Sequence, residues 1–231
     1  EVAVMNYLGV EDRPGAAAYV PRWRHNAADS GGGVLTDMLH IVYLAHWIMG
    51  GPPTSVSAAI DRRLDADGDV EDIALVRYSY PSGYAFVNMA WGKGPGGVEI
   101  GGTKGRIVME TEDDGTHPFV PAKRIRVVGE QGVRSWEPGT PPAYGMVAIL
   151  NDFREAVEQG RAPIASGEAG LRVLDSVLGA YVAGATGEEV ALPLPASHPT
   201  YTKGSTGIAD LDLPADSPAR KRGLFGLSRS A

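Results

Sequence analysis

A series of strand-like segments between residues 56 and 137 constrains the fold more than any other feature of this sequence. Residues 72–80 alternate apolar and polar side chains most clearly, and the turn Pro81-Ser82-Gly83 leads into a second strand at 84–91. Such alternation is typical of strands with one buried face. Further segments of this kind are 56–64, 98–100, 106–110, 124–129 and 133–137, and residues 190–194 are a candidate final strand outside this series. Because short turns join many of them, antiparallel pairing is expected.

Three helices are predicted beside these strands. Residues 34–49 carry apolar side chains around most of the helix, which is typical of a buried helix, and Gly50-Gly51-Pro52-Pro53 ends it. Residues 145–159 and 166–186 have apolar residues at helical spacing. Residues 6–26 are expected to form a surface loop after an initial strand. We therefore predict an α+β fold, with a large, open, mainly antiparallel β-sheet and helices packed on one face.

Composition argues against several classes of protein. The 231 residues include no cysteine, so disulfides, thiolate metal sites and a cysteine nucleophile are excluded. A formal net charge of -7 argues against a nucleic-acid binder, and no apolar run is long enough to span a membrane. Without a secretory leader pattern, a cytoplasmic location is expected. Residues 196–231 are rich in Pro, Ser and Gly, and we expect a flexible tail there, behind a domain at 1–195.

Asp37 and His40 are the candidate catalytic residues. They lie three residues apart on the apolar helix that follows Gly31-Gly32-Gly33, and this spacing predicts that they share one helical face. A carboxylate beside an imidazole can fix its tautomer and stabilise its protonated form, which suits a general base acting on a hydroxyl. The alternative is a buried structural pair bonded to the backbone.

The order of these motifs resembles the C-terminal domain of the Gfo/Idh/MocA family of glucose–fructose oxidoreductases and inositol dehydrogenases. The resemblance covers roughly residues 15–194, although the family usually places its Asp and His four residues apart. It rests on the triple glycine with Asp37 and His40, on Glu71-Asp72 before a strand, on the strand that ends at Trp91, on Glu99-Ile100-Gly101-Gly102-Thr103-Lys104-Gly105 and on the two closing helices.

The resemblance implies a dehydrogenase that transfers a hydride between NAD or NADP and the CH–OH group of a sugar, polyol or derivative. His40 would accept the hydroxyl proton and Asp37 would orient His40. Trp23, Arg24 and His25 resemble the family's substrate-side loop, and Lys93 is a further candidate for substrate binding. The alternatives are that residues 23–25 only anchor the loop and that Lys93 is a solvated loop residue.

The cofactor-binding half is expected to be missing from this chain. No G-x-G-x-x-G fingerprint follows a strand, and the family's Glu-Lys-Pro motif has no counterpart. NAD or NADP would therefore be bound mainly by an N-terminal domain outside this chain. No His, Asp and Glu set has the spacing of a metal site. Expected partners are the small-molecule substrate and other copies of the chain, packed through the open sheet face, but neither nucleic acid nor membrane. The alternative function is a non-catalytic sheet domain that mediates oligomeric assembly.

Overall fold

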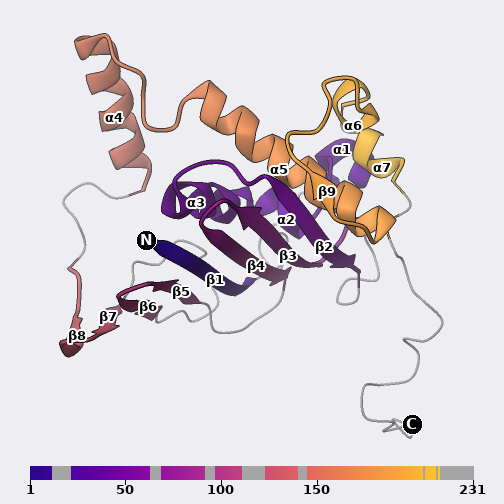
Figure 1. Cartoon of the computed structure of the whole chain (residues 1–231). Coiled ribbons are helices and arrows are strands. Elements are labelled where there is room, and N and C mark those ends of the chain that lie inside the picture. The colour runs from indigo at the N-terminus through magenta and orange to yellow at the C-terminus, as the bar shows by residue number, and fades with distance from the viewer. Residues whose placement is uncertain are drawn as a thin grey trace, which may run out of the picture.

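Nine strands form one open sheet in the part of the chain that the computed structural model describes, which is residues 1–11, 22–62, 69–91, 97–110, 123–139, 145–204, 206–211 and 213. The strand order is β8-β7-β6-β5-β1-β4-β3-β2-β9 (Figure 1), and only β1 and β4 pair in parallel. This confirms the predicted open, mainly antiparallel sheet. The strands are β1 (Val2–Glu11), β2 (Ser55–Asp61), β3 (Ile73–Tyr80), β4 (Gly83–Trp91), β5 (Gly97–Gly102), β6 (Gly105–Glu110), β7 (Arg124–Gly129), β8 (Gly132–Trp136) and β9 (Val190–Ala191).

The first strand is longer than the sequence suggests. β1 continues to Glu11, whereas a surface loop was expected from residue 6 onwards. It lies between two other strands, in parallel register with β4 from Val4 opposite Tyr84 to Glu11 opposite Trp91, and antiparallel to β5. Because a central strand bonds to neighbours on both sides, it need not show the polar alternation from which strands are recognised. The loop prediction was therefore wrong for residues 6–11.

The predicted helix at 34–49 is two helices. It is interrupted at Met38, whose φ of -100° and ψ of 24° separate α2 from α3. Met38 stays buried, so the apolar pattern continues across the break and does not reveal it. The helical segments are η1 (Arg22–His25), α1 (Ala27–Ser30), α2 (Val34–Asp37), α3 (Leu39–Met49), α4 (Met146–Gln159), α5 (Gly167–Thr186), α6 (Pro199–Thr202) and α7 (Thr206–Ala209).

The core lies between one face of the sheet and the helices α2, α3 and α5. The α3 helix packs on β1 and β4, and α5 packs on β2, β9 and α3. Val42, Val76, Val87, Val177 and Tyr181 are fully buried in this layer. The helix layer covers only this half of the sheet, because no described helix makes an extensive contact with β5 to β8. In these residues no helix has the length and apolar content needed to cross a bilayer.

α4 does not join the helix layer, contrary to the expectation that all three long helices pack on the sheet. Figure 1 shows it standing away from the strands. Ala156 is its one buried residue among those described, while Val147, Leu150 and Phe153 are 57%, 60% and 58% exposed. Periodicity therefore identified the helix correctly, but its apolar side has no partner surface within the described chain.

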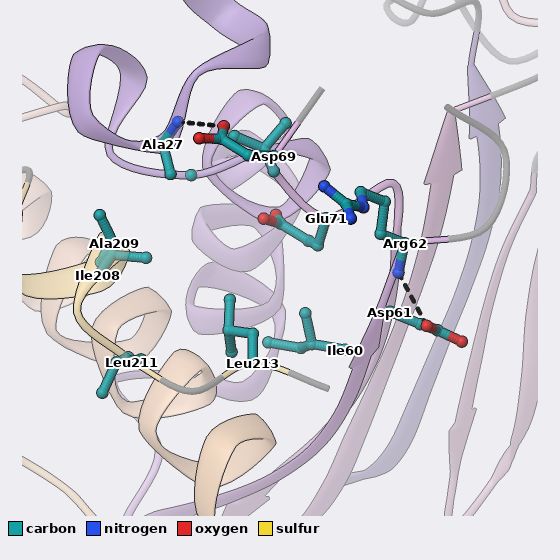
Figure 2. Close-up of a pocket in the computed structure, with 12 residues that line it drawn as sticks. Ala27, Ile60, Asp61, Arg62, Asp69, Glu71, Ile208, Ala209, Leu211 and Leu213 are labelled. Atoms are coloured by element: carbon teal, nitrogen blue, oxygen red, sulfur yellow. Dashed lines mark hydrogen bonds between the residues drawn. The ribbon is translucent and has the colours of Figure 1, made fainter. Parts of the chain in front are cut away.

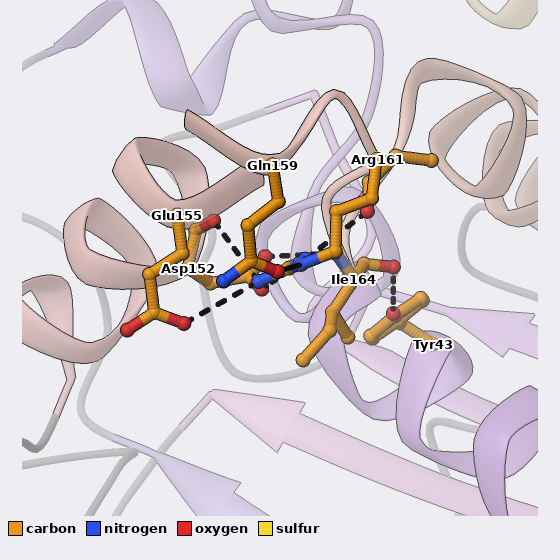
Figure 3. A network of polar contacts seen from close by, with 7 residues as sticks. Tyr43, Asp152, Glu155, Gln159, Arg161 and Ile164 are labelled. Carbon is orange, nitrogen blue, oxygen red and sulfur yellow. Dashed lines mark hydrogen bonds and ion pairs between the residues drawn. The ribbon is translucent and has the colours of Figure 1, made fainter. Parts of the chain in front are cut away.

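Polar contacts connect α4, through the turn that follows it, to the body of the domain (Figure 3). Asp152 accepts a hydrogen bond from the backbone N–H of Ile164 at 2.8 Å and forms an ion pair with Arg161 at 2.9 Å. Tyr43 of α3 donates to the Ile164 carbonyl at 3.0 Å. These bonds fix the turn between α4 and α5 rather than the apolar side of α4.

Part of the segment expected to be a flexible tail is structured. Residues 199–202 and 206–209 form α6 and α7, and Thr200 and Ile208 are buried. The side chain of Asp175 accepts hydrogen bonds from the Leu194 backbone N–H at 3.0 Å and from the Tyr201 hydroxyl. A few such anchors order a stretch whose composition alone suggested disorder. Residues 214–231 of the expected tail lie outside the described residues.

Candidate functional site

A hollow of about 270 Å³ opens where η1, the glycine turn before α2 and the end of β4 meet. The predicted residues Trp23, Asp37 and His40 all line it. His40 is exposed and Asp37 is half-buried. The hollow thus combines an accessible imidazole and a carboxylate with the indoles of Trp23 and Trp91, which suits a small ligand that has both hydroxyl groups and an apolar face.

The structure changes the reason for grouping Asp37 with His40. Asp37 is the last residue of α2 and His40 is the second residue of α3, so they are not on one continuous helix. The shared helical face inferred from their spacing was therefore wrong. Both residues nevertheless reach the same hollow, because the break at Met38 lies between two helices that follow each other directly.

The other predicted substrate-binding residues are placed less uniformly. The His25 ring lies against Trp91, with ring centroids 6.0 Å apart and planes inclined by 31°. The side chain of Arg24 and the whole of Lys93 lie outside the described residues. Trp91 was not predicted as a site residue, although it ends a recognised strand and is 2% exposed at the hollow. Its indole nitrogen has no hydrogen-bond partner among the described residues.

Two of the three glycines before α2 are required by close contacts. A Cβ atom on Gly32, whose φ is +145°, would lie 2.1 Å from the Tyr181 hydroxyl oxygen. A Cβ atom on Gly33 would lie 1.9 Å from the carbonyl oxygen of Glu71. Neither distance is compatible with a larger residue, so the turn can approach Glu71 and Tyr181 only because glycine has no side chain.

Glu71 is the buried centre of this region, and it was noted in the sequence only as part of a resemblance. Its carboxylate accepts hydrogen bonds from the backbone N–H groups of Gly33 at 2.8 Å and Leu35 at 2.9 Å, and from the Tyr181 hydroxyl at 2.7 Å. Burial raises the pKa of Glu71, while these three donors act in the opposite direction. Burial and the neighbouring Glu71 carboxyl raise the pKa of Tyr181 well above its usual value.

A second, smaller pocket of about 140 Å³ lies on the other side of the glycine turn, and Gly32 lines both. In it, Asp69 accepts a hydrogen bond from the backbone N–H of Ala27 at 2.7 Å. Figure 2 shows the C-terminal residues Ile208 and Leu211 on the side of the pocket opposite Arg62. No group of three or more His, Asp and Glu side chains in the described ranges is arranged to hold a metal ion.

Comparisons with known proteins agree with the fold. Residues 5–108 match the sequence model of the GFO/IDH/MocA C-terminal domain. No curated relative matches the chain by sequence. Among solved structures, the chain is similar to the aldose-aldose oxidoreductase from Caulobacter crescentus complexed with glycerol, with 25% identity and a TM-score of 0.69. That match covers 83% of this chain and 56% of the other.

Two further solved structures share the fold at lower identity. Levoglucosan dehydrogenase in complex with NADH and levoglucosan is 18% identical with a TM-score of 0.68, over 84% of this chain and 59% of that one. An oxidoreductase from Agrobacterium radiobacter in complex with NAD+, L-tartaric acid and magnesium is 18% identical with a TM-score of 0.64, over 83% and 57%. The chain therefore spans less than two thirds of the length of each of these proteins.

Proposed function

We propose, from the match of residues 5–108 to the sequence model of the GFO/IDH/MocA C-terminal domain, that this chain is the substrate-binding half of an NAD(P)-dependent dehydrogenase of that family. The substrate would be a sugar, a polyol or a derivative of one, which reacts at a CH–OH group. The observation that carries this proposal is the convergence of Trp23, Asp37, His40 and Trp91 on one hollow. The names of the similar proteins, an aldose-aldose oxidoreductase and a levoglucosan dehydrogenase, support the substrate class.

Each residue of the hollow would have a separate role in binding or in proton transfer. His40, the exposed imidazole, accepts the proton of the substrate hydroxyl, and Asp37 orients the ring and stabilises its protonated form. The half-exposed Trp23 indole packs against the apolar face of a sugar ring. Trp91, which packs against the His25 ring, forms an apolar wall of the hollow.

The cofactor, NAD or NADP, would be bound mainly by an N-terminal dinucleotide-binding domain. A dinucleotide site needs a strand that leads through a glycine-rich turn into a helix. In this chain Gly31-Gly32-Gly33 follows the short helix α1 and not a strand. The N–H groups of Gly33 and Leu35, which a phosphate would need, already donate to the Glu71 carboxylate. When bound, the nicotinamide would supply hydride transfer, and this domain supplies substrate binding and proton removal.

Ligand binding to the isolated chain tests this division. Titration with NADH and with NADPH, followed by nicotinamide fluorescence, should show no saturable binding at micromolar concentration. Titration with glycerol and a panel of aldoses should shift the NMR signals of the His40 ring and the Trp23 indole, and leave those of the distant Trp136 unchanged. Tight NADH binding would contradict the proposed division, and unchanged His40 and Trp23 signals with every polyol would contradict the proposed substrate side.

The exposed face of the sheet favours a second role in assembly. Val4, Leu75, Tyr84 and Phe86 are between 38% and 50% exposed, and they lie on neighbouring strands of the face that the helices leave open. Exposed apolar groups on adjacent strands are typical of an interaction surface. We therefore propose that copies of the chain associate through this face, whether or not the domain also takes part in catalysis.

A further inference from the structure

Four consecutive residues directly before Asp37 are hydrogen-bonded to one buried pair of residues, Glu71 and Tyr181. The N–H groups of Gly33 and Leu35 donate to the Glu71 carboxylate, and the N–H of Val34 donates to the Glu71 carbonyl at 3.1 Å. The Thr36 hydroxyl is hydrogen-bonded to the Tyr181 hydroxyl at 2.9 Å, and Tyr181 in turn donates to Glu71. The segment 33–36 is therefore held at every residue from outside the helix.

The helix α2 depends on this external support. It has four residues, and its N-cap, Gly33, has no side chain with which to bind the free N–H groups. So short a helix is not stable by itself, and unsatisfied N–H groups at a buried helix start are costly. Glu71 satisfies three of them, two through its carboxylate, and hydrogen bonds to a carboxylate are stronger than those between neutral groups.

We infer that Glu71 and Tyr181 are positioning residues for the candidate active site: they fix the segment 33–36 and thereby set where Asp37 and His40 enter the hollow. The consequence for turnover rests on the proposed function, but the effect on the segment does not. Neither residue lines the hollow. They act through the backbone, since the Asp37 N–H donates to the Gly33 carbonyl at 2.9 Å and the chain turns from Asp37 directly into α3.

Tyr78 provides a matched control for Tyr181. Both tyrosines are 0% exposed and both hydroxyls are hydrogen-bonded. The Tyr78 hydroxyl donates to the Ser176 carbonyl at 3.3 Å, a bond that joins β3 to α5 and not to the segment 33–36. Tyr→Phe at either position removes one buried hydroxyl and leaves the ring in place.

The decisive measurement is amide hydrogen exchange by NMR on the 231-residue chain and its variants Y181F and Y78F. Exchange at residues 33–36 should become at least about tenfold faster in Y181F, relative to core amides such as those of Val76 and Val87, because the lost bond is to a carboxylate. The signals of His40 should shift in the same variant. In Y78F, exchange at residues 33–36 should change only as much as exchange in the core. Should Y181F not fold, Glu71→Gln, which keeps one acceptor oxygen, carries the same test.

Equal acceleration at residues 33–36 in Y181F and Y78F would overturn the inference, because both hydroxyls would then act only on overall stability. In an enzyme that contains this chain, Y181F should also lower kcat by about tenfold with little change in KM, whereas Y78F should leave kcat per folded molecule unchanged. If His40→Ala keeps its turnover, the proposed function fails, but the exchange result still decides whether Glu71 and Tyr181 hold the segment.

Discussion

Gly33 contributes both to the packing of the fold and to the geometry of the candidate site. Its missing side chain lets the turn lie against the Glu71 carbonyl, and its N–H donates to the Glu71 carboxylate. Gly33→Ala should therefore destabilise the protein by about 3 kcal/mol, since the Cβ would push the turn away from a backbone atom that cannot easily move. Urea unfolding of the variant measures this loss.

Gly170 is the control for that substitution. It lies inside α5, where an added Cβ would meet no described atom within 4 Å apart from the neighbouring backbone of the helix itself. Gly170→Ala should therefore stabilise the protein slightly, by about 0.5–1 kcal/mol, because alanine is the better helix former. A Gly33→Ala variant as stable as the native chain would show that the turn does not depend on close contact with Glu71.

The glycine turn could be predicted from the sequence, but the contacts that require glycine there could not. The triple glycine with Asp37 and His40 was visible as a motif, and Trp23, a predicted substrate-binding residue, lines the hollow. The partners that require the glycines, Glu71 and Tyr181, lie far along the chain. Contacts of this kind depend on tertiary packing and leave no local periodicity, so neither residue was predicted for the site.

At the scale of elements, His46 connects two helices of the core. Its Nε2 lies 3.0 Å from the Ser176 hydroxyl of α5, and burial, with a smaller contribution from Arg172, lowers its pKa from 6.5 to about 4. Between these values the unfolded chain binds a proton that the folded protein does not. The titration of His46 therefore leaves the free energy of unfolding unchanged above pH 6.5 and lowers it as the pH falls from 6.5 towards 4.

This linkage predicts a specific dependence of the unfolding free energy on pH. Between about pH 7.5 and about pH 5 the native chain should lose roughly 2 kcal/mol that His46→Gln, which cannot titrate, does not lose. Urea unfolding of both proteins at the two pH values measures the difference. Identical pH dependence would mean that His46 is protonated in the folded state or exposed to solvent.

The long helices and most strands were predicted because their periodicity is local, but their boundaries and contacts were not. The break at Met38 was missed because the apolar pattern runs through it, and β1 was cut short because a doubly paired strand lacks alternation. The predicted position of α4 on the sheet was wrong for a different reason. An apolar side indicates that a helix packs against some surface, but it does not indicate which surface.

At the scale of the whole molecule, the open sheet face should mediate association of the chain. Leu75→Glu places a charge on the same face as Val4, Tyr84 and Phe86 and should shift sedimentation towards the monomer. Trp47→Ser is the control, because Trp47 is 70% exposed but lies on α3, away from that face. A native chain that sediments as a monomer at high concentration would contradict the assembly role.

We propose that His40 is the base of a dehydrogenase site and that Asp37 orients it. The most direct test is active-site-normalised turnover, measured with the melting temperature on the same preparations of an enzyme that contains this chain. His40→Ala should lower kcat by roughly a hundredfold to ten-thousandfold with a much smaller change in KM, and Asp37→Asn should fall between it and the native enzyme. A His40→Ala enzyme that melts early yet keeps near-normal turnover per folded molecule would contradict the assignment and make His40 a structural residue.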